Sequence, residues 1–126
     1  MTLINAAGES SEIEVELAAN AAEREHGLMD RAQMAPSHGM LFIFPRESAQ
    51  TFWMKDTLIA LDMVFIRADM TVLGIVSDAE PLTLSPRGVA GQSKYVLEVV
   101  GGYAEKHHWA AGTRVKFDNV SAVPVN

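Results

Sequence analysis

Cysteine is absent from this chain of 126 residues, and the absence removes several kinds of chemistry at once. Without a thiol the protein cannot form disulfides, use a cysteine nucleophile or hold zinc through thiolates. An apolar N-terminal segment is also missing. This leaves the compartment open: the protein is expected to be periplasmic or exported if a signal peptide has been removed, and cytoplasmic otherwise.

Positive charge is also scarce. The chain has 10 Lys and Arg against 16 Asp and Glu, a net charge of −6, and six glutamates fall between Glu9 and Glu25. Phosphate contacts need clustered Lys and Arg, so we expect no binding to nucleic acid or to anionic membranes. Apolar residues at 48% and charged residues at 21% are ordinary for a globular protein and do not indicate a disordered or membrane-inserted one.

The common motifs of catalysis and cofactor binding are missing as well. There is no HExxH zinc pattern, no GxSxG nucleophile elbow, no P-loop and no GxGxxG fingerprint. His107 and His108 are adjacent, so on a helix their side chains diverge by about 100° and do not easily face one ion. We expect no metal and no cofactor, although His26 beside Gly27 could approach a cavity.

Short strands dominate the predicted secondary structure. Ile13, Val15 and Leu17 alternate with glutamates, which is the period of a strand with one wet face. The run GMLFIFP, residues 39–45, has the length and composition of a strand buried on both faces. Further strands are expected over 51–54, 63–66, 71–76, 95–100 and 114–118, with a hairpin loop over 67–70 and a tail over 121–126.

Two short helices complete the prediction. Asn20 with Glu23 three positions later resembles a capping box, and Gly27 can close the helix that follows. A second helix is expected to follow Gly102 and to run through Trp109. With 126 residues the chain has room for one core, so we expect a single domain over 1–126. Its class is mainly β, an antiparallel β-sandwich or a partly open barrel with one or two short helices.

A long loop is predicted over residues 79–94. Pro81, Pro86, Gly88 and Gly91 together forbid a long regular element there. Long loops in small domains are functional or mobile, so this segment is a candidate lid or rim of a binding site.

The segment FWMKDT, residues 52–57, places a cation, an anion and a hydroxyl beside large apolar side chains. Such charges cost several kcal/mol to desolvate unless they are paired or wetted. Lys55, Asp56 and Thr57 are therefore expected at the mouth of a cavity that faces a ligand, or in a turn where Asp56 accepts backbone N–H bonds.

Three other residues have both a structural and a functional interpretation. Glu98 lies inside the apolar run VLEVV, so it is expected in an ion pair with Lys55 or an arginine, or on the wet side of a sheet. Asp62 precedes the apolar run MVFI, where a turn acceptor is expected. Trp53 between two apolar neighbours is typical of a core residue, although such a ring can also stack on a ligand.

Four blocks of the sequence resemble the signature segments of a known family. They are REHGLMDR (24–31), HGMLFIFP (38–45), FWMKDTLIALDMVFI (52–66) and YVLEVVGGYAEK (95–106). In order and spacing these blocks resemble the domain of unknown function 192 (DUF192) family, over residues 15–115. The resemblance implies a small, mainly β, sandwich-like fold of bacterial and archaeal proteins that are frequently exported. It implies no established reaction.

The chain departs from the pattern of that family at two positions. Asp56 stands where asparagine is usual, and Ala60 stands where proline is usual. An ionised carboxylate cannot donate the hydrogen bond that an amide can, so the first change bears on any ligand contact at this position. The second change loosens the backbone slightly and alters no chemistry.

The blocks supply a set of candidate ligand-binding residues: Arg24, Arg31, Trp53, Lys55, Asp56, Thr57, Asp62 and Glu98. The favoured function is a noncatalytic binding module for a small polar or anionic molecule, with the polar trio 55–57 at its rim and the loop 79–94 as a cover. One alternative is an enzyme in which Lys55 acts as acid, base or electrostatic anchor with Asp56 or Glu98 as its partner. The other is a structural or interaction protein. The sequence assigns no substrate, partner or oligomeric state.

Overall fold

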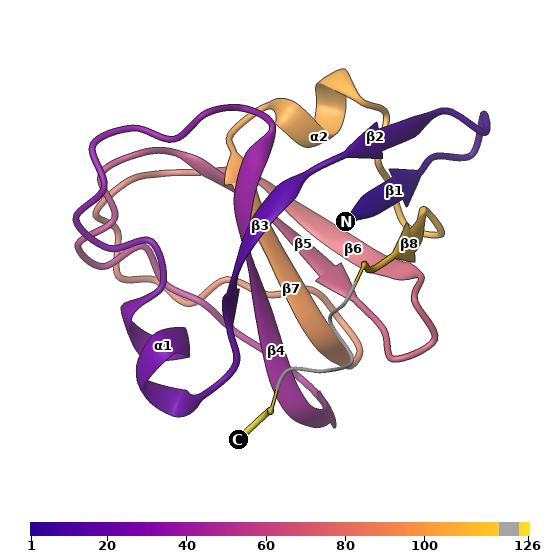
Figure 1. Ribbon diagram of the computed structural model, residues 1–126. Helices are drawn as coiled ribbons and strands as arrows, with labels where there is room; N and C mark the ends of the chain where they lie inside the picture. The colour runs from indigo at the N-terminus through magenta and orange to yellow at the C-terminus, as the bar shows by residue number, and fades with distance from the viewer. Residues whose placement is uncertain (119–123) are drawn as a thin grey trace.

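The computed structural model describes residues 1–118 and 124–126, and these contain eight strands and two short helices in two β-sheets (Figure 1). The larger sheet has the order β3 (Glu14–Ala18), β4 (His38–Ser48), β7 (Ser93–Val100), β5 (Leu61–Ile66) and β6 (Val72–Ala79). The smaller sheet has the order β2 (Ser10–Glu12), β1 (Thr2–Ile4) and β8 (Arg114–Lys116). The mainly β, sandwich-like prediction is confirmed.

One strand pair departs from the antiparallel expectation. All other pairs are antiparallel, but β3 pairs with β4 in parallel, with Glu14 opposite His38. A parallel pair needs a connection of about a dozen residues or more. The segment between β3 and β4 supplies that length and contains helix α1 (Ala21–His26). This crossover carries α1 onto one face of the larger sheet, away from the smaller sheet (Figure 1).

The larger sheet is covered on both faces, so its central strands are buried on both sides. Strand β5 is buried throughout, as are residues 39–43 of β4. Side chains at odd positions of β7, such as Leu97 and Val99, join a core with Leu3 and Val115 of the smaller sheet. Val96 belongs to the opposite core, which is capped by the turn after α1 and by the segment around residue 54. The prediction of a two-sided strand over 39–45 is confirmed for residues 39–43 and fails for Pro45, which is exposed.

Helix α1 begins and ends as its sequence signals predict. The Asn20 side chain accepts a hydrogen bond from the Glu23 backbone N–H at 2.9 Å, and the Glu23 carboxylate accepts from the Ala19 N–H at 3.1 Å. At the other end Gly27 has φ 51°, in the left-handed region that favours glycine. A Cβ there would also lie 3.1 Å from the Phe42 ring. Gly27 therefore lets the end of α1 lie close to the sheet.

Two predicted elements differ from the structure. The strand expected over 51–54 is absent, because Phe52 makes only an isolated bridge to Arg87 in the loop after β6. The second helix, α2 (Tyr103–Lys106), is shorter than expected, and Trp109 follows it in irregular structure. The hairpin loop 67–70 is confirmed between β5 and β6. Residues 121–123 of the expected tail lie outside the described part of the chain. Neither α1 nor α2 is long and apolar enough to cross a membrane, and the described residues contain no other helix.

Asp62 of β5 is completely buried and acts as a structural acceptor. Its Oδ1 accepts hydrogen bonds from the backbone N–H groups of Asp78 at 2.8 Å and Gly102 at 3.1 Å. Its Oδ2 accepts from the Ala104 N–H at 2.9 Å. One carboxylate thus ties the end of β6 to the first turn of α2. Asp62 is an acceptor, as expected, but it lies in strand β5 and accepts from distant segments, not within a local turn.

The substitution Asp62→Ala is expected to lower the free energy of unfolding by about 3 kcal/mol, because three backbone N–H groups lose their acceptor in a buried place. Urea unfolding followed by circular dichroism measures this loss. Asp69→Ala is the matched control, since Asp69 is exposed and caps only its own turn at Thr71. Equal losses in the two variants would contradict the structural role of Asp62.

Candidate functional site

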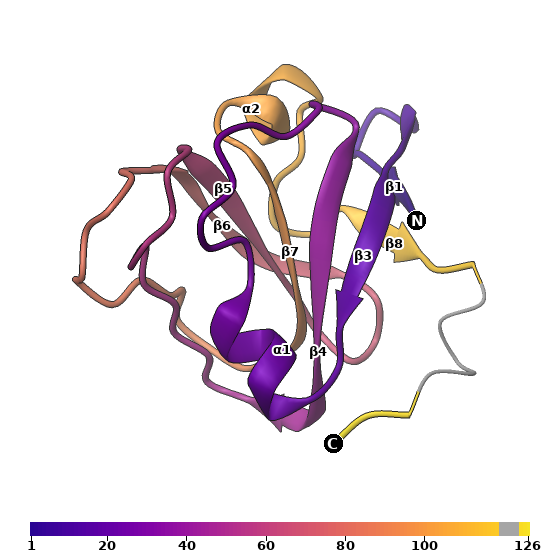
Figure 2. The ribbon, with the colours of Figure 1, turned by 60° about the vertical axis from the view of Figure 1, so that its left-hand side comes forward.

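A pocket of about 550 Å³ lies on the face of the larger sheet that carries α1. Figure 2 shows α1 in front of this face, with the loops β4–β5 and β6–β7 extending from the sheet on the same side. Five separate segments line the pocket: residues 24–29, Phe42 and Phe44 of β4, Thr51, Phe52, Trp53 and Thr57 of the following loop, Leu84 and Pro86 of the β6–β7 loop, and Glu98 of β7. The prediction that the loop 79–94 forms a rim agrees with the position of Leu84 and Pro86.

Aromatic rings form much of the pocket wall. Phe52 meets Phe42 edge to face, with ring centroids 5.0 Å apart, and meets Phe44 in the same way at 6.2 Å. Behind the wall Phe52 also contacts Phe65 of β5 at 6.1 Å. The bridge between Phe52 and Arg87 holds this ring in place through two backbone hydrogen bonds of 2.8 and 2.7 Å. The aromatic part of the wall is therefore apolar and suited to contact a small molecule.

Glu98 is the buried acid of the pocket. It lies on the central strand β7 between Met40 of β4 and Met63 of β5, and only 4% of its surface is exposed. Within residues 1–118 and 124–126 its carboxyl group makes no hydrogen bond and no ion pair. Burial in this apolar place raises the pKa of Glu98 to about 8. The group is therefore largely protonated at neutral pH.

The ion pair expected for Glu98 is wrong. Lys55 places its ammonium 5.3 Å from the centroid of the Trp53 ring and does not line the pocket. Arg24 lines the pocket, but its guanidinium donates to the carbonyl oxygens of Ile43 at 2.9 Å and Asn126 at 2.5 Å. The two candidate cations are thus held by other groups, and the acid takes a proton in place of a partner.

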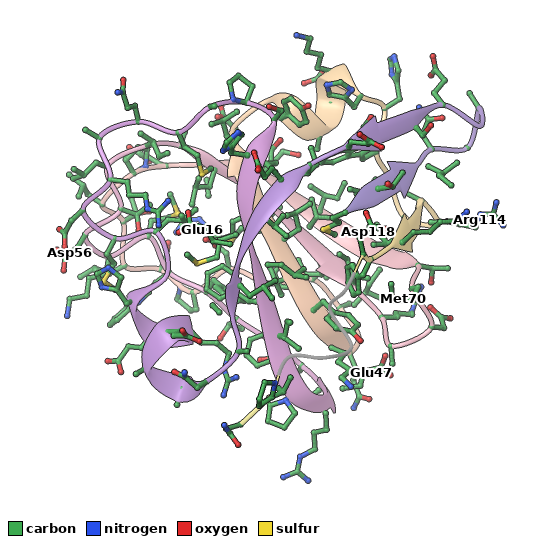
Figure 3. All side chains as sticks on the ribbon, in the orientation of Figure 1. Glu16, Glu47, Asp56, Met70, Arg114 and Asp118 are labelled. Carbon is green, nitrogen blue, oxygen red and sulfur yellow. The ribbon has the colours of Figure 1, made fainter. Side chains whose placement is uncertain are left out.

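Arg31 lies outside the pocket. Its guanidinium forms a two-pronged ion pair with Glu16 of β3, labelled in Figure 3, in which Nη2 donates to Oε1 at 2.8 Å. The hydrogen bond from Arg31 lowers the pKa of Glu16. Both side chains are substantially exposed, so this pair links β3 to the segment after α1 and adds little stability.

The polar trio forms a turn, and only one of its side chains reaches the pocket. Thr57 is 5% exposed, lines the pocket and donates its hydroxyl to the Lys55 carbonyl at 3.1 Å. Lys55 and Asp56 are exposed, and Asp56 lies at the outer edge of the loops (Figure 3). The turn interpretation is confirmed, with one correction: Asp56 accepts the Asp30 N–H through its backbone carbonyl, at 2.8 Å.

The backbone explains why aspartate is compatible with position 56, where the family resemblance implies asparagine. Asp56 has φ 53°, in the left-handed region. Asparagine and aspartate tolerate this region better than other residues with a side chain. The change therefore preserves the turn, and the charge it adds points to solvent beside the pocket.

Trp53 is not a core residue. It is 47% exposed and lines the pocket, while its neighbour Met54 is fully buried. The Met54 N–H donates to the Thr83 carbonyl at 2.9 Å, which turns Met54 inward and leaves Trp53 at the rim. The core prediction fails because the expected strand over 51–54 does not form. The alternative, in which the Trp53 ring stacks on a ligand, agrees with its position in the pocket lining.

Several lining residues were not predicted from the sequence. They are Glu25, Gly27, Leu28, Met29, Phe42, Phe44, Thr51 and Phe52. Phe42 and Phe44 alternate along β4, and that period could have shown that they share a face. His26, which the sequence placed near a cavity, also lines the pocket. In the part of the chain that the structure describes, no group of three or more His, Asp or Glu could hold a metal ion.

Two solved structures resemble this chain over most of its length. One, from Sinorhizobium meliloti and described as a "putative transcription regulator", is 39% identical with a TM-score of 0.89, over 91% of this chain and 89% of the other. The other is a protein of unknown function from Novosphingobium aromaticivorans, 34% identical with a TM-score of 0.88, over 92% of this chain and 82% of the other. No curated protein matches the chain significantly.

The family resemblance inferred from the four sequence blocks is confirmed. Residues 2–117 match the family model described as "Uncharacterized ACR". Both solved structures have the same fold as this chain, and each is identical to it at more than a third of the aligned residues. This level of identity indicates common descent. The chain therefore belongs to the DUF192 family.

Proposed function

We propose that this protein is a noncatalytic binding module for a small molecule with an apolar body and a polar group. One observation carries the proposal: Glu98, buried and without a partner among the described residues, faces a pocket walled by aromatic rings. A buried polar group without a hydrogen bond is costly, and a ligand that satisfies it recovers that free energy on binding.

The size and lining of the pocket support a small-molecule ligand. Its volume of about 550 Å³ falls in the range of about 300–1,000 Å³ that is usual for such sites. The lining is mainly apolar, with Thr57 and Glu98 as the buried polar groups. This is the usual composition of a ligand site, in which a few polar atoms orient an apolar body.

The charges on the lining favour a neutral polar or cationic group over an anionic one. Glu25 and Glu98 are acids, and the guanidinium of Arg24 already donates to two backbone carbonyls. Lys55, the cation expected at the rim, does not line the pocket. An anion would therefore meet a buried acid and no unengaged cation.

The enzyme alternative has one observation in its favour. A carboxyl group with a raised pKa in a pocket is a common feature of acid–base catalysts. The proposed partner Lys55 is held on the Trp53 ring, so catalysis through a Lys55–Glu98 pair has no geometric support. Glu98 would have to act alone, and we therefore favour binding.

The alternative of an interaction protein rests on exposed apolar side chains in the loops. Trp53, Leu58, Leu82 and Leu84 are exposed on neighbouring loops. The regulator description of the Sinorhizobium protein does not extend to DNA binding here, because a net charge of −6 without a basic cluster opposes contact with phosphates. A regulatory role would have to act through a ligand or a protein partner.

A thermal-shift panel of small molecules that combine an apolar body with a polar group tests the proposed function. A ligand present at about 100 times its Kd stabilises the folded state by about 2.7 kcal/mol, which raises the melting temperature by several degrees. Trp53→Ala is expected to weaken such a shift severalfold. Leu58→Ala is the matched control, because Leu58 has the same 47% exposure but does not line the pocket. Flat melting curves across a broad panel would rule the proposal out.

The raised pKa of Glu98 predicts a pH-dependent stability. Below the ordinary pKa of 4.5, Glu98 is protonated in both the folded and the unfolded state. The contribution of its raised pKa to the free energy of unfolding is then fully present. As the pH rises toward about 8, the unfolded state releases the proton while the folded state keeps it, and the free energy of unfolding falls by several kcal/mol. Above about pH 8 both states are ionised and the loss stops.

Urea unfolding of wild type and Glu98→Gln across this pH range measures the effect. The amide does not titrate, so the variant is expected to lose most of the decline. Glu105→Gln, at an exposed glutamate of α2, is expected to keep it. The same decline in wild type and Glu98→Gln would show that Glu98 is not the buried acid described here.

A further inference from the structure

We propose that the pocket selects organic ammonium ions, with the Glu98 carboxylate as counter-ion and aromatic rings around the apolar body of the ligand. This rests on the proposed function and specifies its ligand class. A cation can do what no described side chain does, because it supplies N–H donors and a positive charge to a carboxyl group that has neither. Charge-assisted hydrogen bonds of this kind are about twice as strong as neutral ones.

Glu98 lines the pocket, and only 4% of its surface is exposed. Met40 and Met63 lie opposite Glu98 on the two neighbouring strands, and both are buried. The backbone of β7 is paired on both edges at this residue, so its own amides are already used in the sheet. A donor for the acid therefore comes from the pocket, either from solvent or from a ligand that displaces it.

The rings of the pocket wall suit a cation. Phe42, Phe44, Phe52 and Trp53 all line the pocket, and the negative face of an aromatic ring attracts positive charge. Two of these rings already carry a cation of the protein: the Arg24 guanidinium lies 5.2 Å from the Phe44 centroid, and the Lys55 ammonium lies 5.3 Å from that of Trp53. Phe42 and Phe52 have no such cation among the described residues.

The other titratable groups that line the pocket all come from the end of α1. They are Arg24, Glu25 and His26, while the pocket residues of β4, of the segment 51–57 and of the β6–β7 loop carry no titratable group. Arg24 repels a cation, but Glu25 offsets its charge, and its guanidinium is bound to two carbonyl groups. An ionised Glu98 therefore leaves an excess of negative charge on the lining.

Ammonium binding also requires Glu98 to lose its proton. The step is an acid–base exchange in which the carboxyl proton leaves to solvent as the ammonium enters, and the ligand keeps its own charge. Burial raises the pKa of the free carboxyl to about 8, so the apparent affinity is expected to rise with pH up to about 8 and then to level off. The slope is expected to approach, and not to exceed, tenfold per pH unit.

Isothermal titration calorimetry with matched ligands tests this proposal. The probes are phenethylamine, phenethyl alcohol and hydrocinnamate, together with butylamine, butanol and butyrate, each in two buffers of different ionisation enthalpy near neutral pH. We expect each amine to bind at least about tenfold more tightly than its alcohol, the acids to bind most weakly, and close to one proton to be released per amine bound.

Three variants identify the group responsible. Glu98→Gln is expected to abolish the preference for amines and the proton release while it still binds the alcohols. Glu105→Gln, at an exposed position of α2 that does not line the pocket, is expected to behave as wild type. His26→Gln is expected to retain the pH dependence, which assigns it to Glu98 and not to the histidine. Circular dichroism of each variant checks that it folds.

The outcomes separate the ligand class from the function itself. Alcohols that bind wild type as tightly as amines would overturn the inference and leave the binding module standing, as would proton release that persists in Glu98→Gln. If none of the six probes binds, the ammonium class is rejected. The broader thermal-shift panel then decides separately whether the pocket binds any small molecule.

Discussion

The burial of β7 on both faces and both edges is the constraint on which the rest of the structure depends. It pairs with β4 on one side and β5 on the other, and side chains of a strand alternate between the two faces of its sheet. Leu97 and Val99 therefore enter one core, and Val96 and Glu98 are directed into the other. No register of this strand leaves Glu98 in water. The buried acid is tolerated because it is protonated and because it borders a pocket.

Close backbone approach maintains this arrangement. A Cβ on Gly39 would lie 2.4 Å from the Glu98 carbonyl oxygen, so only glycine lets β4 lie at this distance from β7. On the pocket side Gly27 performs a similar role, because it brings the end of α1 against Phe42. Gly27 thus lines the pocket itself, whereas Gly39 fixes the spacing of the two strands behind it. The electrostatics of Glu98 follow from this packing.

Local signals predicted those elements whose hydrogen bonds and caps are local, and failed where distant segments supply the hydrogen bonds. The cap at Asn20 and the run 39–45 were predictable because each depends on neighbours within a few residues. The strand expected at 51–54 was wrong because Phe52 and Met54 take their hydrogen bonds from the β6–β7 loop, about thirty residues away. The wrong prediction for Trp53 has the same cause. Without the expected strand, Trp53 lies at the rim of the pocket and not in the core.

The sequence by itself determined the family, the mainly β class, the ends of α1 and the presence of an acid inside an apolar strand. Those features depend on composition, on period and on residues close together in the chain. Only the tertiary structure decided that Glu98 lacks a partner among the described residues, that Lys55 stands on Trp53, and that five distant segments enclose one pocket. These features depend on contacts between segments that are distant in the sequence. Strand order and the paths of the loops determine those contacts.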